Sequence, residues 1–309
     1  MILKIGTRGS KLAVAQSLWV KKRIEARYED IQVELVTIKT TGDKILDSSL
    51  SRVGGKGLFV KEIEEALLTE RVDVAVHSMK DVPADLTEGL VLCSFPERED
   101  PSDALVSKGD KSIETLPLHS RVGTSSLRRS AQLLHMRPDL QIVPLRGNVD
   151  TRLRKLESGD VDAVVLATAG LKRLGFENII SHVIPYDQIM PAIGQGALGL
   201  EARRYDQRTI DLLSFLNHES TETAVKAERS FLRELGGGCQ VPIAGFAQLS
   251  ADLVHLKGMV AELDGRWIVS DEITGRKDQA EESGIKLARM LIDAGAQEIL
   301  ARIYGDFSI

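Results

Sequence analysis

The chain contains little cysteine and few aromatic residues. Its 309 residues include two cysteines, Cys93 and Cys239, and aromatic residues make up 4% of the sequence. So few cysteines argue against a disulfide framework and fit a reducing compartment, so we expect a cytoplasmic protein. The formal net charge is −5, and no aromatic residues interleave with the basic ones of the arginine-rich residues 121–155. We therefore expect no nucleic-acid partner.

Long hydrophobic runs are also missing, as are His-x-x-x-His and Cys-x-x-Cys pairs. No apolar run approaches the length of a membrane span, and the first twelve residues contain no stretch typical of a signal peptide. We expect no membrane partner. The six histidines are scattered, so no metal site is predicted. Residues 54–57 (GGKG) lack the spacing of a P-loop, and no dinucleotide fingerprint occurs, which disfavours a nucleotide-dependent enzyme.

Short apolar strands alternate with amphipathic helices over the first two-thirds of the chain. This pattern predicts an α/β fold with mostly parallel sheets covered by helices. The charged segment at residues 97–102 is expected to cross between two domains. From about residue 222 the order becomes helix, three strands, helix, which indicates a separate small α+β domain. The expected strands are 3–6, 33–38, 72–76, 90–95, 142–145, 163–166, 244–249, 253–262 and 266–274, with one near Val122, and the expected helices are 10–27, 59–68, 127–136, 149–156 and 279–294.

One cysteine lies in an unusual loop. Residues 236–242 read GGGCQVP, and the three glycines place the thiol of Cys239 on an adaptable loop. Such a thiol suits covalent chemistry, although most cysteines are small buried hydrophobes. The loop by itself leaves both interpretations open. Cys93, in an apolar strand, is expected to belong to the core.

The middle of the chain is rich in arginine. Residues 121–155 contain eight Arg or Lys residues against two acids. Two clusters, GTSSLRR at 123–129 and LRGNVDTR at 145–152, each lie where a strand gives way to a helix. Backbone N–H groups, hydroxyls and guanidinium groups can converge on an anion there. For Arg128, Arg129, Arg146 and Arg152 a carboxylate or phosphate site is favoured over simple solvation of helix surfaces.

A third polar segment follows an apolar strand. Residues 77–81 read HSMKD, and they place Asp81 beside Lys80 after that strand. An acid in that position is a candidate proton donor or cation stabiliser, although a solvated turn residue is more common. Residues 7–10 (TRGS) repeat the strand-to-helix pattern and add Arg8 at a sheet edge.

Taken together, these segments resemble the porphobilinogen deaminase (hydroxymethylbilane synthase) family. The resemblance runs from Thr7 nearly to the C-terminus. Seven segments occur in the family's order, and this combination is highly specific. They are TRGS at 7–10, VGGKGLF at 53–59, HSMKD at 77–81, VGTSSLRR at 122–129, LRGNVDTR at 145–152, PAIGQGA at 191–197 and GGCQVP at 237–242.

The resemblance implies a transferase of haem biosynthesis. Such an enzyme condenses four porphobilinogen molecules, with loss of ammonia through an azafulvene, and releases hydroxymethylbilane by hydrolysis. It implies a dipyrromethane cofactor joined to Cys239 by a thioether, on which the chain grows. Each ring brings an acetate and a propionate, which explains the arginine excess. Asp81 would be the catalytic residue, which assists departure of the amine and stabilises the pyrrole cation.

The resemblance also assigns the remaining site residues and the domains. Two α/β domains like those of periplasmic binding proteins would enclose a cleft, and a third domain would present Cys239 to it. We expect three domains, the first at residues 1–98 with 195–216, the second at 99–194 and the third at 217–309. We also expect a monomer that acts on a small molecule. The implied cofactor-binding residues are Ser78, Lys80, Asp81, Thr124, Ser126, Arg128, Arg129, Arg146, Gly147, Asn148 and Cys239, and the implied substrate-binding residues are Arg8, Ser10, Lys56, Phe59, Arg146, Arg152, Arg173 and Gln195.

Two other functions stay open on the residues alone. A cytoplasmic carboxylate-binding protein could share the two-domain cleft without catalysing a reaction, although Asp81 and the thiol loop argue against it. A phosphate-handling enzyme is the third possibility, and it requires phosphate esters to compete for the arginine clusters.

Overall fold

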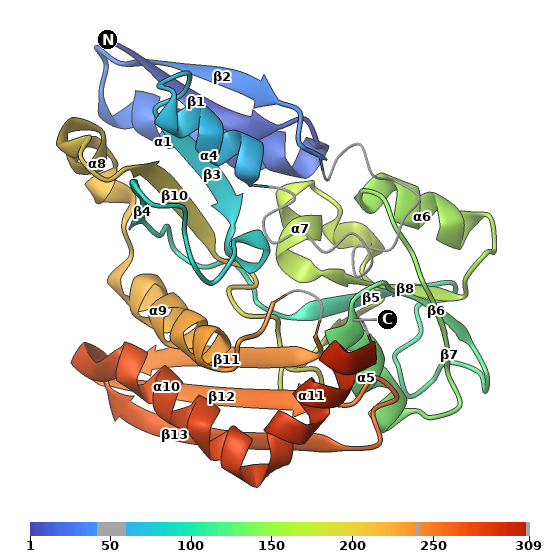
Figure 1. The fold of residues 1–309 in the computed structure, drawn as a ribbon. Helices are drawn as coiled ribbons and strands as arrows, with labels where there is room; N and C mark the ends of the chain where they lie inside the picture. The colour runs from blue at the N-terminus through green and yellow to red at the C-terminus, as the bar shows by residue number, and fades with distance from the viewer. Residues whose placement is uncertain (42–59, 239–240, 307–309) are drawn as a thin grey trace.

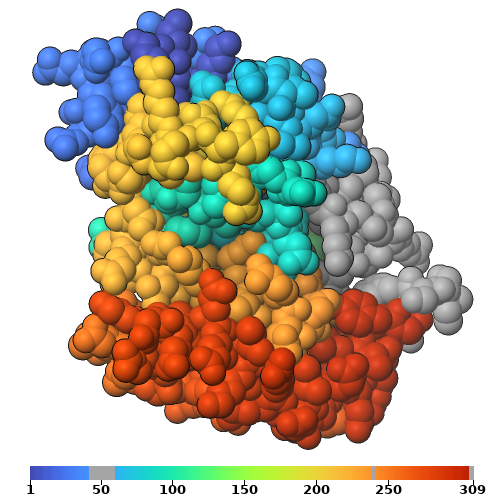
Figure 2. Space-filling view, turned by 60° about the vertical axis from the view of Figure 1, so that its left-hand side comes forward, coloured from blue at the N-terminus to red at the C-terminus, as the bar shows by residue number. Residues whose placement is uncertain are grey.

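A computed structural model of the protein describes residues 1–41, 60–238 and 241–306. The described chain forms two five-stranded sheets and a three-stranded sheet, each with helices packed against it (Figure 1). In Figure 2 the N-terminal residues lie at one end of the molecule and the C-terminal helices at the other. None of the described helices is both long and apolar enough to cross a membrane.

The first sheet combines the first four strands of the chain with β10, which follows the strands of the second sheet in sequence. Its strand order is β2-β1-β3-β10-β4, with β1 parallel to β2 and β3, and β10 antiparallel to β3 and β4. Ser10 starts the first helix, because its hydroxyl accepts a hydrogen bond from Ala13 N at 3.3 Å. The elements are β1 (Ile2–Arg8), α1 (Lys11–Arg27), β2 (Gln32–Ile38), α4 (Lys61–Leu68), β3 (Val74–Ser78), β4 (Leu90–Ser94), β10 (Leu198–Arg203) and α8 (Gln207–Leu213).

The second sheet has the same mixture of strand directions. Its order is β7-β6-β8-β5-β9, with β6 parallel to β7 and β8, and β5 antiparallel to β8 and β9. The elements are β5 (Asp103–Ser107), β6 (Arg121–Gly123), α5 (Leu127–Met136), β7 (Gln141–Val143), α6 (Val149–Glu157), β8 (Ala163–Ala167), α7 (Thr168–Arg173) and β9 (His182–Ile184).

The expectation of mostly parallel sheets is wrong. Each large sheet has two parallel and two antiparallel pairings, because one of its strands directly follows a crossing of the chain from the other sheet. The chain crosses from β4 to β5 and returns from β9 to β10, and the entering strands β5 and β10 run against their neighbours. The two crossings are hydrogen-bonded to each other, since Glu99 N donates to Gly196 O at 3.2 Å. The α/β fold class itself is confirmed.

The C-terminal part is an antiparallel meander covered by helices. Strands β11, β12 and β13 pair in sequence order, and α9 and α10 pack on them around the fully buried Phe231. The predicted C-terminal helix is shorter than expected and is followed by a five-residue π segment and a further helix. The elements are α9 (Glu219–Glu234), β11 (Ile243–Ser250), β12 (Leu253–Ala261), β13 (Ile268–Arg276), α10 (Ala280–Leu291), the π segment (Ile292–Ala296) and α11 (Gln297–Asp306).

Candidate active site

The turn from β6 into α5 is organised by hydroxyl groups. Thr124 is buried, and its Oγ1 accepts a hydrogen bond from Ser126 N at 3.2 Å. Ser126 is the N-cap of α5, and its Oγ accepts from Arg129 N at 3.4 Å. Because the helix starts directly after the strand, its first turn places Arg128 and Arg129 at the edge of the second sheet.

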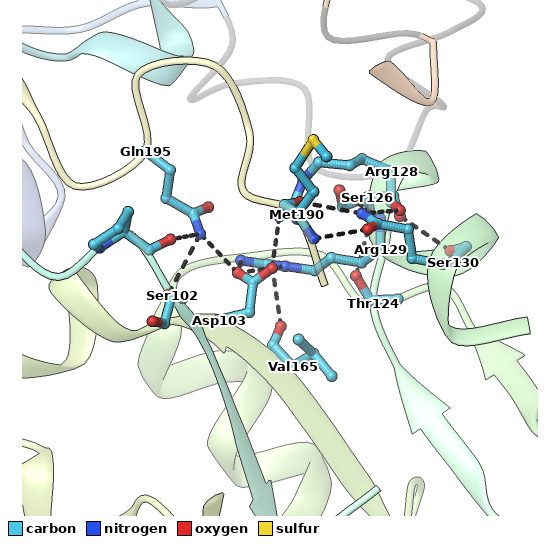
Figure 3. Close-up of polar contacts among 12 residues, drawn as sticks. Ser102, Asp103, Thr124, Ser126, Arg128, Arg129, Ser130, Val165, Met190 and Gln195 are labelled. Atoms are coloured by element: carbon cyan, nitrogen blue, oxygen red, sulfur yellow. Dashed lines mark hydrogen bonds and ion pairs between the residues drawn. The ribbon is translucent and has the colours of Figure 1, made fainter. Parts of the chain in front are cut away.

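Both of these arginines are buried and pair with one carboxylate (Figure 3). Asp103, at the start of β5, lies 2.6 Å from Arg129 Nη2 and 2.8 Å from Arg128 Nη2. Burial alone would raise the pKa of the Asp103 carboxyl, but the two guanidinium groups outweigh burial and hold that pKa well below its usual range. Asp103 is therefore an ionised internal partner of the predicted anion-binding residues.

The two guanidinium groups also donate to backbone carbonyl groups. Arg128 Nη1 lies 2.6 Å from Met190 O, and Arg129 Nη1 lies 3.1 Å from Val165 O. Within the described residues, Arg128 Nε has no hydrogen-bond partner although it is buried. Burial lowers the pKa of Arg128, while Asp103 opposes that shift. An unsatisfied buried N–H group on an arginine fits a ligand that carries carboxylates.

The end of β3 brings a second group of charges to the same place. A short 3-10 turn, Met79–Asp81, follows the strand, with Lys80 half-buried and Asp81 exposed. Burial and the charge of Arg129 lower the pKa of Lys80 to about 8, and the charge of Asp81 opposes this shift. Ser78, at the end of the strand, accepts a hydrogen bond from Gln16 Nε2 at 2.9 Å. Lys80 and Asp81, at the end of a strand of the first sheet, therefore lie close enough to the arginines of the second for their charges to interact.

Arg152 of α6 completes this group. Burial and the charge of Arg129 lower the pKa of Arg152 to about 10, and Asp81 opposes the shift. Asn148 caps α6, because its Oδ1 accepts a hydrogen bond from Thr151 N at 3.0 Å. Gly147 has a positive φ of 96°, and its carbonyl oxygen accepts from Arg152 Nε at 3.1 Å. In this part of the molecule the sequence-predicted residues supply both the cations and the turns that position them.

Other predicted site residues lie at the crossings and at strand ends. Arg173 Nη2 donates to Gly196 O at 2.7 Å, and burial lowers its pKa while Glu99 opposes this. Gln195 is 1% exposed and donates from Nε2 to Pro101 O at 2.7 Å. Arg8 ends β1, Ser10 caps α1, and Arg146 is half-buried before α6.

Three predicted residues lie outside the described part of the chain. These are Cys239, which was expected to carry the cofactor, and Lys56 and Phe59, which were expected to bind substrate.

Sequence reasoning missed Asp103. Its segment, PSDALVS at 101–107, places an acid directly before an apolar run, which is a weak signal because such acids are common at strand starts. The buried position of this acid, with 0% of its surface exposed, depends on where β5 lies in the sheet.

Two family models match the chain. Residues 3–211 match "Porphobilinogen deaminase, dipyromethane cofactor binding domain", and residues 222–293 match "Porphobilinogen deaminase, C-terminal domain". The chain is 55% identical over 302 residues to the porphobilinogen deaminase of Geobacter metallireducens, which covers 98% of this chain and 95% of that protein. It is 54% identical to that of Trichlorobacter lovleyi over 303 residues, with 98% and 96% covered.

Solved structures of other proteins match part of the chain. The methionine binding protein MetQ covers 70% of this chain and 89% of its own, with 18% identity and a TM-score of 0.46. A substrate binding domain of a molybdenum ABC transporter from Clostridium difficile covers 71% and 93%, with 10% identity and a TM-score of 0.46.

Proposed function

The chain belongs to the porphobilinogen deaminase family, and on that premise we propose that it joins four porphobilinogen molecules into a linear tetrapyrrole with loss of ammonia. It is then a transferase of porphyrin and haem biosynthesis that releases hydroxymethylbilane by hydrolysis. The alternative of a carboxylate-binding protein without catalysis is not favoured, because the curated relatives that span 98% of this chain are named as an enzyme.

We propose that a dipyrromethane cofactor is attached through a thioether to Cys239. The described residues fit such a group, because the site has more positive than negative charges. The cations are Lys80, Arg128, Arg129 and Arg152, and the carboxylates that act on them are those of Asp81 and Asp103. This positive surplus, with the buried Arg128 Nε that lacks a partner among the described residues, matches the acetate and propionate of each pyrrole ring. When bound, the cofactor supplies the pyrrole carbon to which the first substrate unit is joined.

Asp81 is the residue to which we assign the chemistry. Its carboxyl can deliver a proton to the departing amine and can then stabilise positive charge on the pyrrole nitrogen of the substrate. The observation that carries this assignment is the position of Asp81, an exposed acid beside the half-buried Lys80 in the turn that follows β3. Its charge opposes the lowering of the pKa of Arg152 of α6, so a cation of the second sheet also lies near it. The cations around Asp81 would bind the carboxylates of the substrate and so hold its reacting ring beside this carboxyl.

The other predicted residues would hold carboxylates or position those that do. We propose that Arg8, Ser10, Arg146, Arg152, Arg173 and Gln195 contribute to substrate binding, together with Lys56 and Phe59 outside the described residues. Thr124, Ser126 and Asn148 would act largely as caps that orient the helices behind Arg128, Arg129 and Arg152.

The domain limits and the cellular setting are part of the same proposal. We propose domains at 1–98 with 195–216, at 99–194 and at 217–309, and the entry of β10 into the first sheet supports the discontinuity. We further propose that the protein acts as a monomer. We also propose that it lies in the cytoplasm, a location that the low cysteine content supports.

Intact-mass measurement tests the proposed function. The purified protein should carry a stable excess mass equal to two pyrrole rings, and Cys239→Ser should lose it together with turnover of porphobilinogen. Cys93→Ser is the matched control: this half-buried thiol donates to Leu200 O at 3.4 Å within the first sheet and should not affect the excess mass. An unmodified wild-type protein that binds porphobilinogen without converting it would contradict the proposal.

A further inference from the structure

We propose that Asp103 is a positioning residue of the reaction, and that with Gln195 behind it Asp103 holds Arg128 and Arg129 so that their remaining N–H groups meet ligand carboxylates. This inference rests on the proposed function. It assigns a role to a carboxylate that would otherwise be read as a stabilising ion pair only.

The two oxygens of Asp103 separate the two arginines. Oδ1 accepts from Arg129 Nε at 3.0 Å and from Nη2 at 2.6 Å, while Oδ2 lies 2.8 Å from Arg128 Nη2 (Figure 3). The three side chains are at most 6% exposed. A buried carboxylate cannot exchange these partners for water, so it fixes one guanidinium group at each of its two oxygens.

Each guanidinium is held at a second point. Met190 O accepts from Arg128 and Val165 O accepts from Arg129, so neither side chain can turn about its long axis. A guanidinium has five N–H groups, and these contacts use only part of them. In the described residues Arg128 Nε is buried without a hydrogen-bond partner, so the contacts with Asp103 and Met190 leave this donor unused.

Gln195 extends the arrangement to the crossing between the two large sheets. Its Nε2 lies 2.9 Å from Asp103 Oδ1 (Figure 3). The same Nε2 lies 2.7 Å from Pro101 O. The return crossing therefore contacts the outgoing one through the same amide that fixes the carboxylate. We infer that a movement of the return crossing would shift Asp103 and, through it, the guanidinium groups of Arg128 and Arg129.

Charge balance explains why a carboxylate suits this position. Arg128, Arg129, Lys80 and Arg152 lie close enough to affect one another's pKa, and without a counter-charge they would repel. One internal carboxylate reduces that repulsion before the ligand binds, yet it leaves an excess of positive charge for the ligand. An apolar residue at position 103 would leave the guanidinium pair without an orienting partner.

A double-mutant cycle tests the role of Asp103. Asp103→Asn keeps the shape of the side chain and removes its charge, and it should raise the KM for porphobilinogen about tenfold or more, with a smaller change in kcat per loaded molecule. Arg129→Lys should also raise KM. If Asp103 acts through the two arginines, the KM of the double variant should rise by less than the product of the two single effects, because Arg129→Lys already removes part of what Asp103 positions. Multiplying effects, or a wild-type KM in folded Asp103→Asn, would overturn the proposal.

The controls separate positioning from stability. Asp139→Asn removes a carboxylate that binds Arg137 just beyond the C-terminal end of α5, so it should leave KM unchanged. If Asp103→Asn does not fold, Gln195→Met removes the amide contact with Asp103 at similar volume. It should raise KM less, again with less than a multiplying effect beside Arg129→Lys, and multiplying effects there would also contradict the proposal. Each sample is compared with active wild-type protein, so an inactive wild type counts against the proposed function and not against Asp103.

Discussion

Lys80 and Asp81 are neighbours in sequence but lie in different surroundings. Lys80 is half-buried and its pKa is lowered to about 8, chiefly by burial, whereas Asp81 is exposed. An exposed carboxyl beside several cations can approach a bound substrate without the desolvation that a buried acid requires. At the scale of the residue, this contrast supports our proposal that Asp81 takes part in the reaction and that the cations around it bind carboxylates.

Substitution of Asp81 should affect catalysis and leave the fold intact. We expect Asp81→Asn to lower turnover by about 10²–10⁴-fold, since an amide can neither deliver a proton nor stabilise a cation. The thermal midpoint should stay near that of the wild type because the side chain is exposed. Asp85→Asn is the control: this acid lies on the same segment and pairs with Arg233 at 3.1 Å. Near-normal product formation by Asp81→Asn would refute the assigned role.

Helix α5 connects the site to the C-terminal sheet. Its first turn carries Arg128 and Arg129, and further along the helix His135 Nδ1 donates to Gly265 O at 2.8 Å, in the turn between β12 and β13. Gly265 has a φ of +72°, and a Cβ there would meet Ala131 O and, at 2.7 Å, His135 N. At the scale of the element, this close approach requires glycine for its backbone conformation and for its lack of a side chain.

A pair of glycine substitutions measures this contact. Gly175 has the same φ of +72°, but a Cβ there would meet nothing within 4 Å. Gly175→Ala should cost about 1 kcal/mol from the backbone conformation alone. Gly265→Ala should cost about 1–3 kcal/mol more, because the methyl group overlaps the backbone of α5. Chemical denaturation gives both values, and equal losses would mean that the hairpin and α5 separate at little cost.

One buried carboxylate joins the three sheets at the scale of the molecule. Glu228 of α9 is 0% exposed, and it accepts from Arg98 Nη1 at 2.6 Å and from Nη2 at 3.1 Å. It also accepts from Gly194 N at 2.6 Å and from Ala247 N at 2.9 Å. Its donors therefore come from both crossings and from β11. This side chain therefore connects both crossings to the C-terminal sheet.

Removal of this carboxylate should weaken the whole protein. Glu228→Ala should lower the free energy of unfolding by about 3–5 kcal/mol, because Arg98 would remain buried without its partner. Asp278→Ala, which breaks an exposed pair with Arg276, should leave stability nearly unchanged. Denaturant titration compares the two variants with the wild type. A small loss in Glu228→Ala would indicate that water or another acid replaces the carboxylate.

Local signals were sufficient to predict much of the secondary structure. Helix α5 occupies the predicted residues 127–136, because Ser126 caps its start and Pro138 follows its end. The strands β5, β9 and β10 were not predicted. Their partners lie far away in sequence, and β10 carries Glu201 and Arg203 as buried polar residues that obscure an apolar strand pattern.

The sequence by itself determined the family, the cationic clusters and the acid beside them, because glycine, hydroxyl and arginine motifs carry those signals within a few residues. Only the tertiary structure decided which charges meet. Asp103 binds Arg128 and Arg129 because β5 enters the second sheet antiparallel to β8, and Glu228 binds Arg98 because α9 packs against both crossings. Such pairings depend on long-range strand order and burial, and a buried charge takes its partner from whatever the fold places within reach.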